Sequence, residues 1–79
     1  MTGRTLDIVE CLKVRLDAAK EAGEKTKEGR IYSKLGFVYN RRGDFRRAID
    51  CNTNALATAE EVGDRVGEGS AYCNLRVCR

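Results

Sequence analysis

An internal repeat of forty residues is the feature that most restricts how this chain can fold. A gapless shift of forty residues places residues 23–35 over residues 63–75, and glycine, glutamate, tyrosine and leucine recur at matching positions. Four residues of the preceding stretch also meet an identical residue forty positions later: Cys11, Leu16, Ala19 and Glu21. Such periods are typical of solenoid proteins, in which each unit buries its apolar face against its neighbours.

Apolar residues within each period recur at helical spacing, three and four residues apart. The four stripes are Val9, Leu12, Leu16 and Ala19; Ile31, Tyr32, Leu35, Val38 and Tyr39; Phe45, Ala48, Ile49, Ala55, Leu56 and Ala59; and Ala71, Tyr72 and Leu75. No strand pattern competes with them, and the absence of proline leaves the helices uninterrupted. The sequence therefore predicts an all-α fold of four antiparallel helices.

Glycines and capping residues set the expected helix boundaries. Gly23 and Gly63 favour left-handed C-terminal turns, whereas Thr5, Asp44 and Asp64 are suited to accept hydrogen bonds from free amides at helix starts. The chain then forms a single repeat segment, residues 1–79. We expect residues 6–22 to form a second-type helix of a partial repeat, residues 25–62 a complete helix pair, and residues 65–79 a first-type helix of another partial repeat.

The composition excludes several classes of function. The chain has no histidine and no pair of cysteines spaced for zinc, so we expect no metal site, no cofactor and no enzymatic activity. The four cysteines are expected to be free and mostly buried thiols. No apolar run approaches the eighteen residues of a membrane span, and no apolar signal core begins the sequence, so we expect a cytoplasmic protein that does not enter membranes.

The net charge of +3 hides an uneven distribution. Residues 25–47 contain eight basic and two acidic residues, whereas residues 48–69 contain one basic and five acidic residues. A solvated helix face explains this pattern, and so does a surface that attracts an acidic peptide. Nucleic acid is not expected as a partner, because the excess charge is small and no nucleic-acid motif is present.

Several residues match the spacing of the tetratricopeptide repeat, including the aromatic-x-x-Leu-Gly-x-x-Tyr motif of residues 32–39. The matching residues are Tyr32, Leu35, Gly36, Tyr39, Gly43, Phe45, Ala48 and Ala55. The chain thus resembles this family, and its forty-residue period resembles the long repeats of the Pins/LGN cell-polarity adaptors and of large related animal proteins. The resemblance implies an α-solenoid that serves as a protein-interaction scaffold.

The resemblance also implies a peptide-binding concave groove lined by first-type helices. The residues at groove-facing positions are Arg30, Ser33, Lys34, Phe37, Asn40, Arg41, Ser70, Cys73, Asn74 and Val77. Their chemistry suits an acidic peptide, because guanidinium groups bind carboxylates in a bidentate way and amide side chains bind a peptide backbone.

Two departures from the family pattern affect the packing and leave an alternative open. Asn52 stands where the family often has an aromatic residue, so its helix pair is expected to pack less tightly, and Arg76 replaces the glycine matched by Gly36. Both partial repeats are expected to expose apolar surface. The chain is then either a fragment that adjoins neighbouring repeats or a structural unit that self-associates through its ends.

Overall fold

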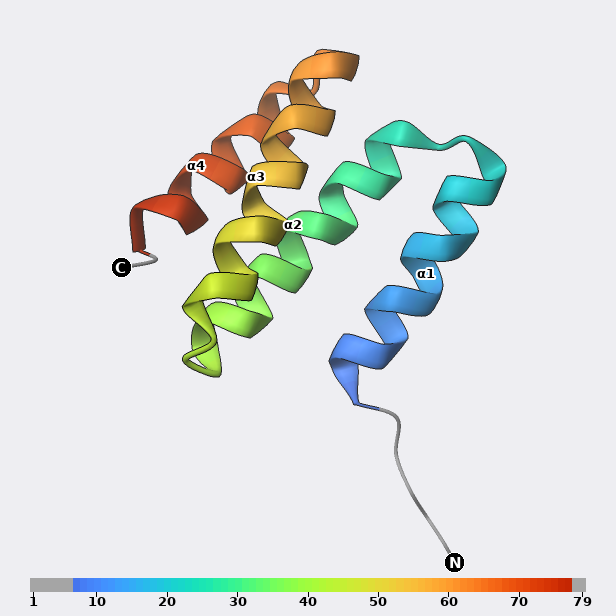
Figure 1. The fold of residues 1–79 in the computed structure, drawn as a ribbon. Helices are drawn as coiled ribbons and strands as arrows, with labels where there is room; N and C mark the ends of the chain where they lie inside the picture. The colour runs from blue at the N-terminus through green and yellow to red at the C-terminus, as the bar shows by residue number, and fades with distance from the viewer. Residues whose placement is uncertain (1–6, 78–79) are drawn as a thin grey trace, which may run out of the picture.

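The computed structural model describes residues 7–77, except for the side chain of Val77, and its regular elements over that range are all α-helices. The four helices are α1 (Ile8–Ala22), α2 (Lys25–Arg41), α3 (Phe45–Val62) and α4 (Arg65–Val77), and successive helices run antiparallel (Figure 1). The all-α prediction is confirmed. No described helix is both long enough and apolar enough to span a membrane.

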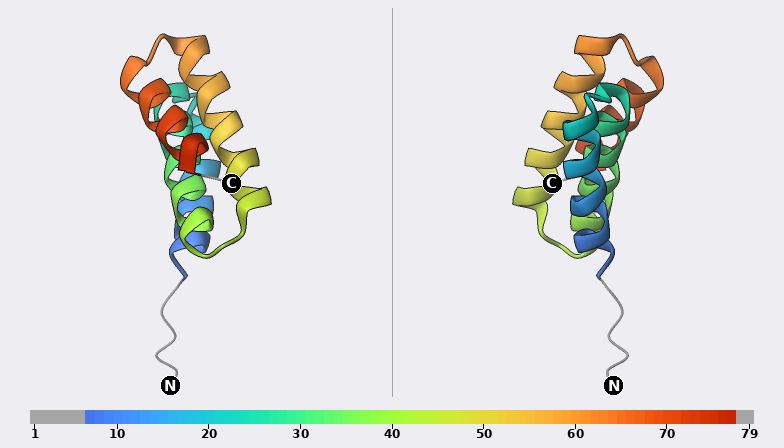
Figure 2. Two further views of the ribbon diagram at one scale, coloured as in Figure 1. Left: turned by 90° about the vertical axis from the view of Figure 1, so that its left-hand side faces the viewer. Right: turned by 90° about the vertical axis from the view of Figure 1, so that its right-hand side faces the viewer.

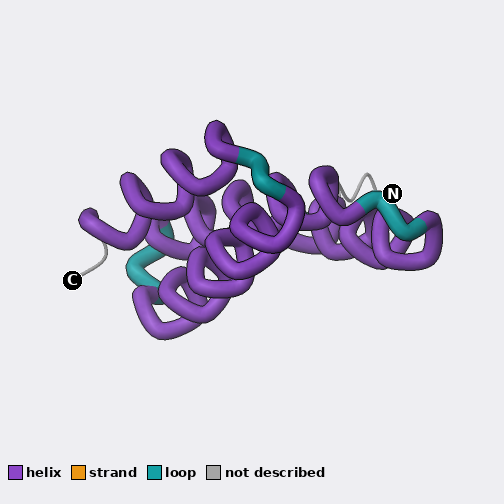
Figure 3. The backbone as a smooth tube through the Cα atoms, turned by 90° about the horizontal axis from the view of Figure 1, so that it is seen from above, coloured by secondary structure: helices purple, strands orange, loops and turns teal. Residues whose placement is uncertain are grey.

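Helix α2 lies at the centre of the arrangement. The side views place α1 on one side of α2, and α3 with α4 on the other (Figure 2). Seen from above, α1 and α4 lie at opposite ends of the row of helices (Figure 3). Among the described helices, α1 packs against α2 alone, whereas α2, α3 and α4 all contact one another.

The three connections between helices have the same geometry and recur every twenty residues. Each contains a glycine with positive φ: 71° at Gly23, 83° at Gly43 and 74° at Gly63. The amide of the following residue donates back to a carbonyl of the last helical turn, over 2.8 to 2.9 Å. This is the Schellman motif, which favours glycine because a Cβ atom is disfavoured at positive φ.

Aspartates cap three of the helices. Asp44 accepts from the Arg47 amide at 3.3 Å and Asp64 from the Gly67 amide at 3.2 Å, as predicted from the sequence. Helix α1 is capped by Asp7, which forms a capping box with Glu10, and the helix begins at Ile8. The predicted cap, Thr5, lies outside the described residues.

The core has an aliphatic part and a part built of small residues. Stripes from α1 and α2 form the first part together with Ala48: Val9, Leu12, Leu16, Ala19, Ile31, Leu35 and Tyr39. The other buried apolar residues of α3 and α4 are Ala55, Ala59 and Ala71. Phe45, Ile49 and Tyr72, which were predicted to line the core, are 41%, 42% and 51% exposed instead, so both α3 and α4 present apolar surface.

Asn52 packs more tightly than its sequence position suggested. Its side chain is completely buried, and it lies so close to Gly36 that a Cβ atom on Gly36 would overlap the Asn52 amide. The atoms nearest to Gly36 therefore belong to Asn52 rather than to the small residues Ala48 and Ala55 of the same helix. A glycine in the middle of α2 costs roughly 1 kcal/mol of helix propensity, and here it makes room for the Asn52 amide.

Candidate binding groove

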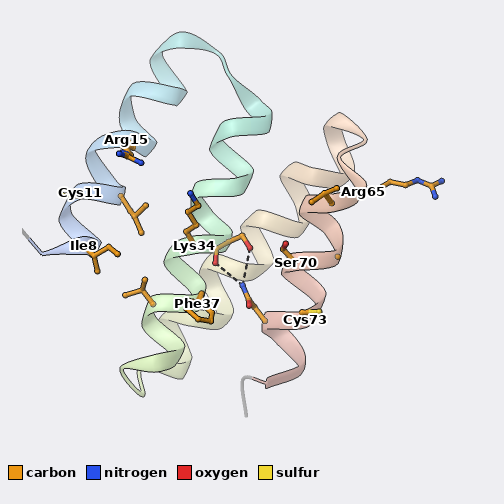
Figure 4. A pocket seen from close by; sticks show the side chains of 14 residues that line it. Ile8, Cys11, Arg15, Lys34, Phe37, Arg65, Ser70 and Cys73 are labelled. Carbon is orange, nitrogen blue, oxygen red and sulfur yellow. Dashed lines mark hydrogen bonds between the residues drawn. The ribbon is translucent and has the colours of Figure 1, made fainter.

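A groove of about 880 Å³ crosses one face of the molecule, with α2 in the middle and α1 and α4 on either side (Figure 4). We call it the binding groove. The residues that line it are Ile8, Cys11, Leu12 and Arg15 of α1; Ser33, Lys34, Phe37 and Val38 of α2; and Arg65, Val66, Gly69, Ser70, Cys73 and Asn74 of α4.

The α1 side of the groove is formed by a single helix face. Ile8, Cys11 and Arg15 are spaced three and four residues apart, so they lie above one another along the helix. They adjoin the stripe that α1 buries against α2, and this position leaves them open to solvent on the groove side. Ile8 is 53% exposed, which gives this side an accessible apolar surface.

Helix α2 contributes both apolar and cationic groups to the groove. Phe37 is 49% exposed, although a ring of this size is usually more deeply buried in a small domain. The Arg41 guanidinium lies 5.7 Å from the centre of the Phe37 ring, which is within the range of a cation–π interaction. Lys34, one residue before Leu35 of the core, extends its amine into the groove.

Hydrogen bonds from Asn74 fix α4 in position relative to α2 and α3. The Asn74 amide nitrogen donates to the Ser33 carbonyl oxygen over 3.1 Å and to Asn52 Oδ1 over 3.0 Å, with Ser33 Oγ at 3.3 Å. Within residues 7–77, every buried side-chain nitrogen and oxygen atom has a hydrogen-bond partner. Because a satisfied polar cluster holds its members in one arrangement, these contacts set the separation of α2 and α4.

The lining of the groove carries positive charge without compensation. Its charged residues are Arg15, Lys34 and Arg65, and no acidic residue is among those that line it. Neither Arg15 nor Lys34 forms an ion pair with a described residue. Arg65 points away from the groove (Figure 4). Arg15 and Lys34 are therefore the cations available to a ligand.

Arg30 has a structural contact instead. Its guanidinium donates to both carboxylate oxygens of Asp64, over 3.1 and 3.2 Å. The hydrogen bond from Arg30 and the one from the Gly67 amide lower the pKa of the Asp64 carboxyl group. This pairing joins the second turn of α2 to the residue that caps α4.

The predicted site residues separate into two groups in the structure. Six line the binding groove: Ser33, Lys34, Phe37, Ser70, Cys73 and Asn74. Arg30, Asn40 and Arg41 do not line it, and the side chain of Val77 lies outside the described residues. Ser33 is buried, and the amide nitrogen of Asn74 is already engaged within the protein.

Sequence reasoning missed the whole α1 side of the groove. Ile8, Cys11, Leu12 and Arg15 were not considered, because residues 6–22 were assigned to a second-type helix and groove positions were taken from first-type helices. The usable signal was the spacing of Ile8, Cys11 and Arg15, which predicts a second face beside the core stripe.

The cysteines are less buried than expected. Cys11 and Cys51 are half-buried, Cys73 is exposed, and all three are free; Cys78 lies outside the described residues. Burial raises the pKa of the Cys51 thiol, which disfavours the reactive thiolate. Among residues 7–77 no cluster of three potential metal ligands occurs.

Comparison with known proteins finds one informative relative. The human protein named SH3 domain and tetratricopeptide repeat-containing protein 2 is 36% identical to this chain over 72 residues. The match covers 91% of this chain and 5% of that protein, so the chain spans a small part of its relative. No protein-family model matches the sequence, and no solved structure matches it. The relative and the four antiparallel helices are both consistent with a helical repeat of the tetratricopeptide type.

Proposed function

We infer that this chain is a protein-interaction module that binds a peptide segment of a partner protein in the binding groove. The observation that carries this inference is the groove lining, which combines exposed apolar side chains with Arg15 and Lys34 and contains no acidic residue. Repeat folds commonly use such concave surfaces for binding, and the human relative carries this type of repeat in its name.

The lining also indicates the chemistry of the partner segment. Ile8, Phe37 and Val66 are 53%, 49% and 69% exposed, so apolar partner side chains would gain by covering them. Arg15 and Lys34 would pair with partner carboxylates, and the guanidinium can do so through two hydrogen bonds. We therefore propose an acidic segment with apolar anchors.

Charge reversal in the groove tests this function. Peptides selected on the immobilised chain from a random phage-displayed library should be rich in acidic and apolar residues. The double variant Arg15→Glu/Lys34→Glu should bind the selected peptides about tenfold more weakly or worse, because two attractive pairs become repulsive. Fluorescence anisotropy of the labelled peptides measures the change, and rising salt should reduce the difference between variant and wild type.

A matched control separates groove contacts from total charge. The variant Lys13→Glu/Arg46→Glu changes the net charge equally at exposed positions that do not line the groove, and it should keep its affinity within about twofold. Selected peptides that bind the groove variant as tightly as the wild type would exclude the proposed site.

Fewer observations support two further proposals, a relationship to the Pins/LGN adaptors and self-association of the chain through its ends. The forty-residue period supports a proposal that the chain is related to long-repeat proteins such as the Pins/LGN adaptors. Self-association through the ends is supported by the exposed Phe45, Ile49 and Tyr72. It is opposed by Arg76, which occupies on α4 the position that glycine occupies in α2.

A further inference from the structure

Four arginines surround the turn that joins α2 to α3. Residues 41–47 contain these four arginines and one aspartate, so this short segment carries a net charge of +3. Its exposed large side chains, which we call the basic tip, are Arg41, Arg42, Phe45, Arg46 and Arg47. None of them lines the binding groove, so the proposed peptide-binding function does not use them.

The turn brings the arginines together at one end of the α2–α3 pair. Helix α2 ends at Arg41 and α3 begins at Phe45, with the left-handed Gly43 between them. Because the two helices run antiparallel, the last turn of α2 and the first turn of α3 lie next to each other, at the lower end of the molecule (Figure 1). The row of helices extends from α1 to α4, across the direction in which the helices point (Figure 3). A helix added at either end of the row would therefore leave this turn open to solvent.

Carboxylates of the protein neutralise only part of this charge. Arg42 and Arg47 each form an ion pair with one aspartate, and the Arg47 side chain is still 67% exposed. Arg41 and Arg46 form no ion pair within residues 7–77, although the Arg41 guanidinium lies over the ring of Phe37. A guanidinium group has five N–H donors, so an arginine that has one carboxylate partner can still bind a second anion.

The opposite end of the helix pair is acidic. Residues 24–28 and 60–65 together contain three basic and five acidic residues. The ion pair between Lys25 and Glu61 shows that these two segments lie side by side. The α2–α3 pair is therefore positive at one end and negative at the other. Such a separation of charge would turn the basic tip toward any extended anionic surface.

The shape of the basic tip suits a surface better than a small molecule. Small ligands bind in concave pockets that bury most of their area. The residues of the basic tip line neither the binding groove nor two smaller cavities of about 480 and 410 Å³. Phe45 adds an apolar ring, 41% exposed, among the guanidinium groups. Basic clusters of about this size, accompanied by an exposed aromatic residue, are typical of segments that bind anionic membrane surfaces.

We propose that the basic tip binds the surface of membranes that contain anionic lipids. The arginines contact lipid phosphate and carboxylate groups, and the Phe45 ring enters the headgroup region, while the helices stay outside the hydrocarbon core. The binding groove lies along the sides of α1, α2 and α4, so it stays accessible when the end of the helix pair rests on a membrane. The proposal goes beyond the peptide-binding function and does not depend on it.

Vesicle sedimentation of the full chain tests the proposal. Vesicles of phosphatidylcholine with about 30% phosphatidylserine should bind the chain, vesicles of phosphatidylcholine alone should not, and rising salt should weaken the binding. The variant Arg41→Glu/Arg46→Glu changes the two arginines that have no carboxylate partner, so the fold should be kept. It should bind the anionic vesicles about twentyfold more weakly or worse, because each basic residue near such a surface contributes roughly fivefold.

Three further variants separate the basic tip from total charge and from arginine geometry. Lys25→Glu/Lys27→Glu makes the same charge change at the acidic end, beyond the screening distance of about 10 Å, and should keep vesicle affinity within about twofold. Arg41→Lys/Arg46→Lys keeps the charge and should keep affinity within about threefold. Phe45→Ser should weaken binding about fivefold through lost apolar contact. Circular dichroism should show all variants folded.

The other outcomes each overturn the inference. No binding to the anionic vesicles, or equal binding by Arg41→Glu/Arg46→Glu and the wild type, would show that the basic tip is not a membrane contact. An equal loss in Lys25→Glu/Lys27→Glu would assign the effect to net charge. A loss in Arg41→Lys/Arg46→Lys as large as in the glutamate variant would contradict attraction by charge. Tighter binding of a short DNA duplex than of vesicles, abolished by Arg41→Glu/Arg46→Glu, would assign the basic tip to nucleic acid.

Discussion

At the residue scale, one buried amide determines how three of the helices meet. Asn52 fills the space above Gly36 and accepts a hydrogen bond from Asn74, which also binds Ser33. A hydrophobic residue at position 52 would leave the Asn74 amide with fewer partners, and a buried polar group without a partner costs about 1–3 kcal/mol. The polar cluster thus links the central helix to the far side of the binding groove.

Two of the helix glycines, Gly36 and Gly69, make this role measurable. Gly36→Ala should destabilise the chain by roughly 1–3 kcal/mol, because the new Cβ atom overlaps the buried Asn52 side chain. Gly69→Ala meets no atom within 4 Å of the new Cβ, so it should stabilise the chain by about 0.5–1 kcal/mol through helix propensity. Urea unfolding followed by circular dichroism measures both, and equal effects of the same sign would refute the packing role of Asn52.

The sequence indicated part of this arrangement. A glycine within an apolar stripe, such as Gly36, permits the close approach of another helix, and α3 does approach it closely. The pattern alone points to small side chains such as Ala48 and Ala55 at this contact, whereas the nearest atoms are those of Asn52. Burial of Asn52 depends on a hydrogen bond from Asn74, twenty-two residues away, and periodicity carries no information about such a pairing.

At the element scale, repeated turns and caps fix the helix lengths. Glycines at positions 23, 43 and 63 end α1, α2 and α3, and each next helix begins two residues later. Thr5 was the cap predicted for α1 from sequence, although Asp7 is also a residue type suited to cap a helix. Glu10 decides in favour of Asp7, because a glutamate three residues after the cap completes the capping box. Asp7 also pairs with Arg42 at the end of α2.

Asp64 combines a helix cap with an ion pair, and acid should weaken it. Its pKa is lowered in the folded chain, chiefly by Arg30, so its charged form stabilises the fold above the pKa of the unfolded chain, about 3.9. This stabilisation is lost as the pH falls through the lower folded-state pKa. Asp64→Asn removes the charge but keeps an acceptor, so it should lower the Tm at neutral pH. It should have little effect at about pH 2, where the stabilisation by the charged form is being lost.

Thermal unfolding followed by circular dichroism measures this difference. Asp50→Asn is the matched control, because Asp50 is an exposed carboxylate of α3 that forms no ion pair within residues 7–77. It should leave the Tm close to that of the wild type at neutral pH. An Asp64→Asn deficit that persists unchanged in acid would mean that the Arg30–Asp64 pair does not stabilise the fold.

At the scale of the whole molecule, the stacking of helices creates the binding groove. Local periodicity was sufficient to predict four antiparallel helices and most of the core. The six predicted residues that line the groove, on α2 and α4, came from the family resemblance and not from periodicity. Local periodicity did not predict that α1 forms the opposite side of the groove, since this depends on the position of α1 relative to α4 across α2. Nor did it predict the exposure of Phe45 and Ile49. Their exposure depends on how the other helices pack against α3, and the spacing of apolar residues within α3 does not determine that packing.

The central claim is that a partner segment binds between α1 and α4 over α2. Nuclear magnetic resonance of the nitrogen-15-labelled chain, titrated with a library-selected acidic peptide as the probe, tests it most directly. We predict concentration-dependent shifts of backbone amides on all three helices, at Cys11, Phe37 and Ser70, with little change at Arg46 and Thr53 on the exposed side of α3. Shifts confined to α3, or no shifts in the groove at saturating probe, would contradict the claim.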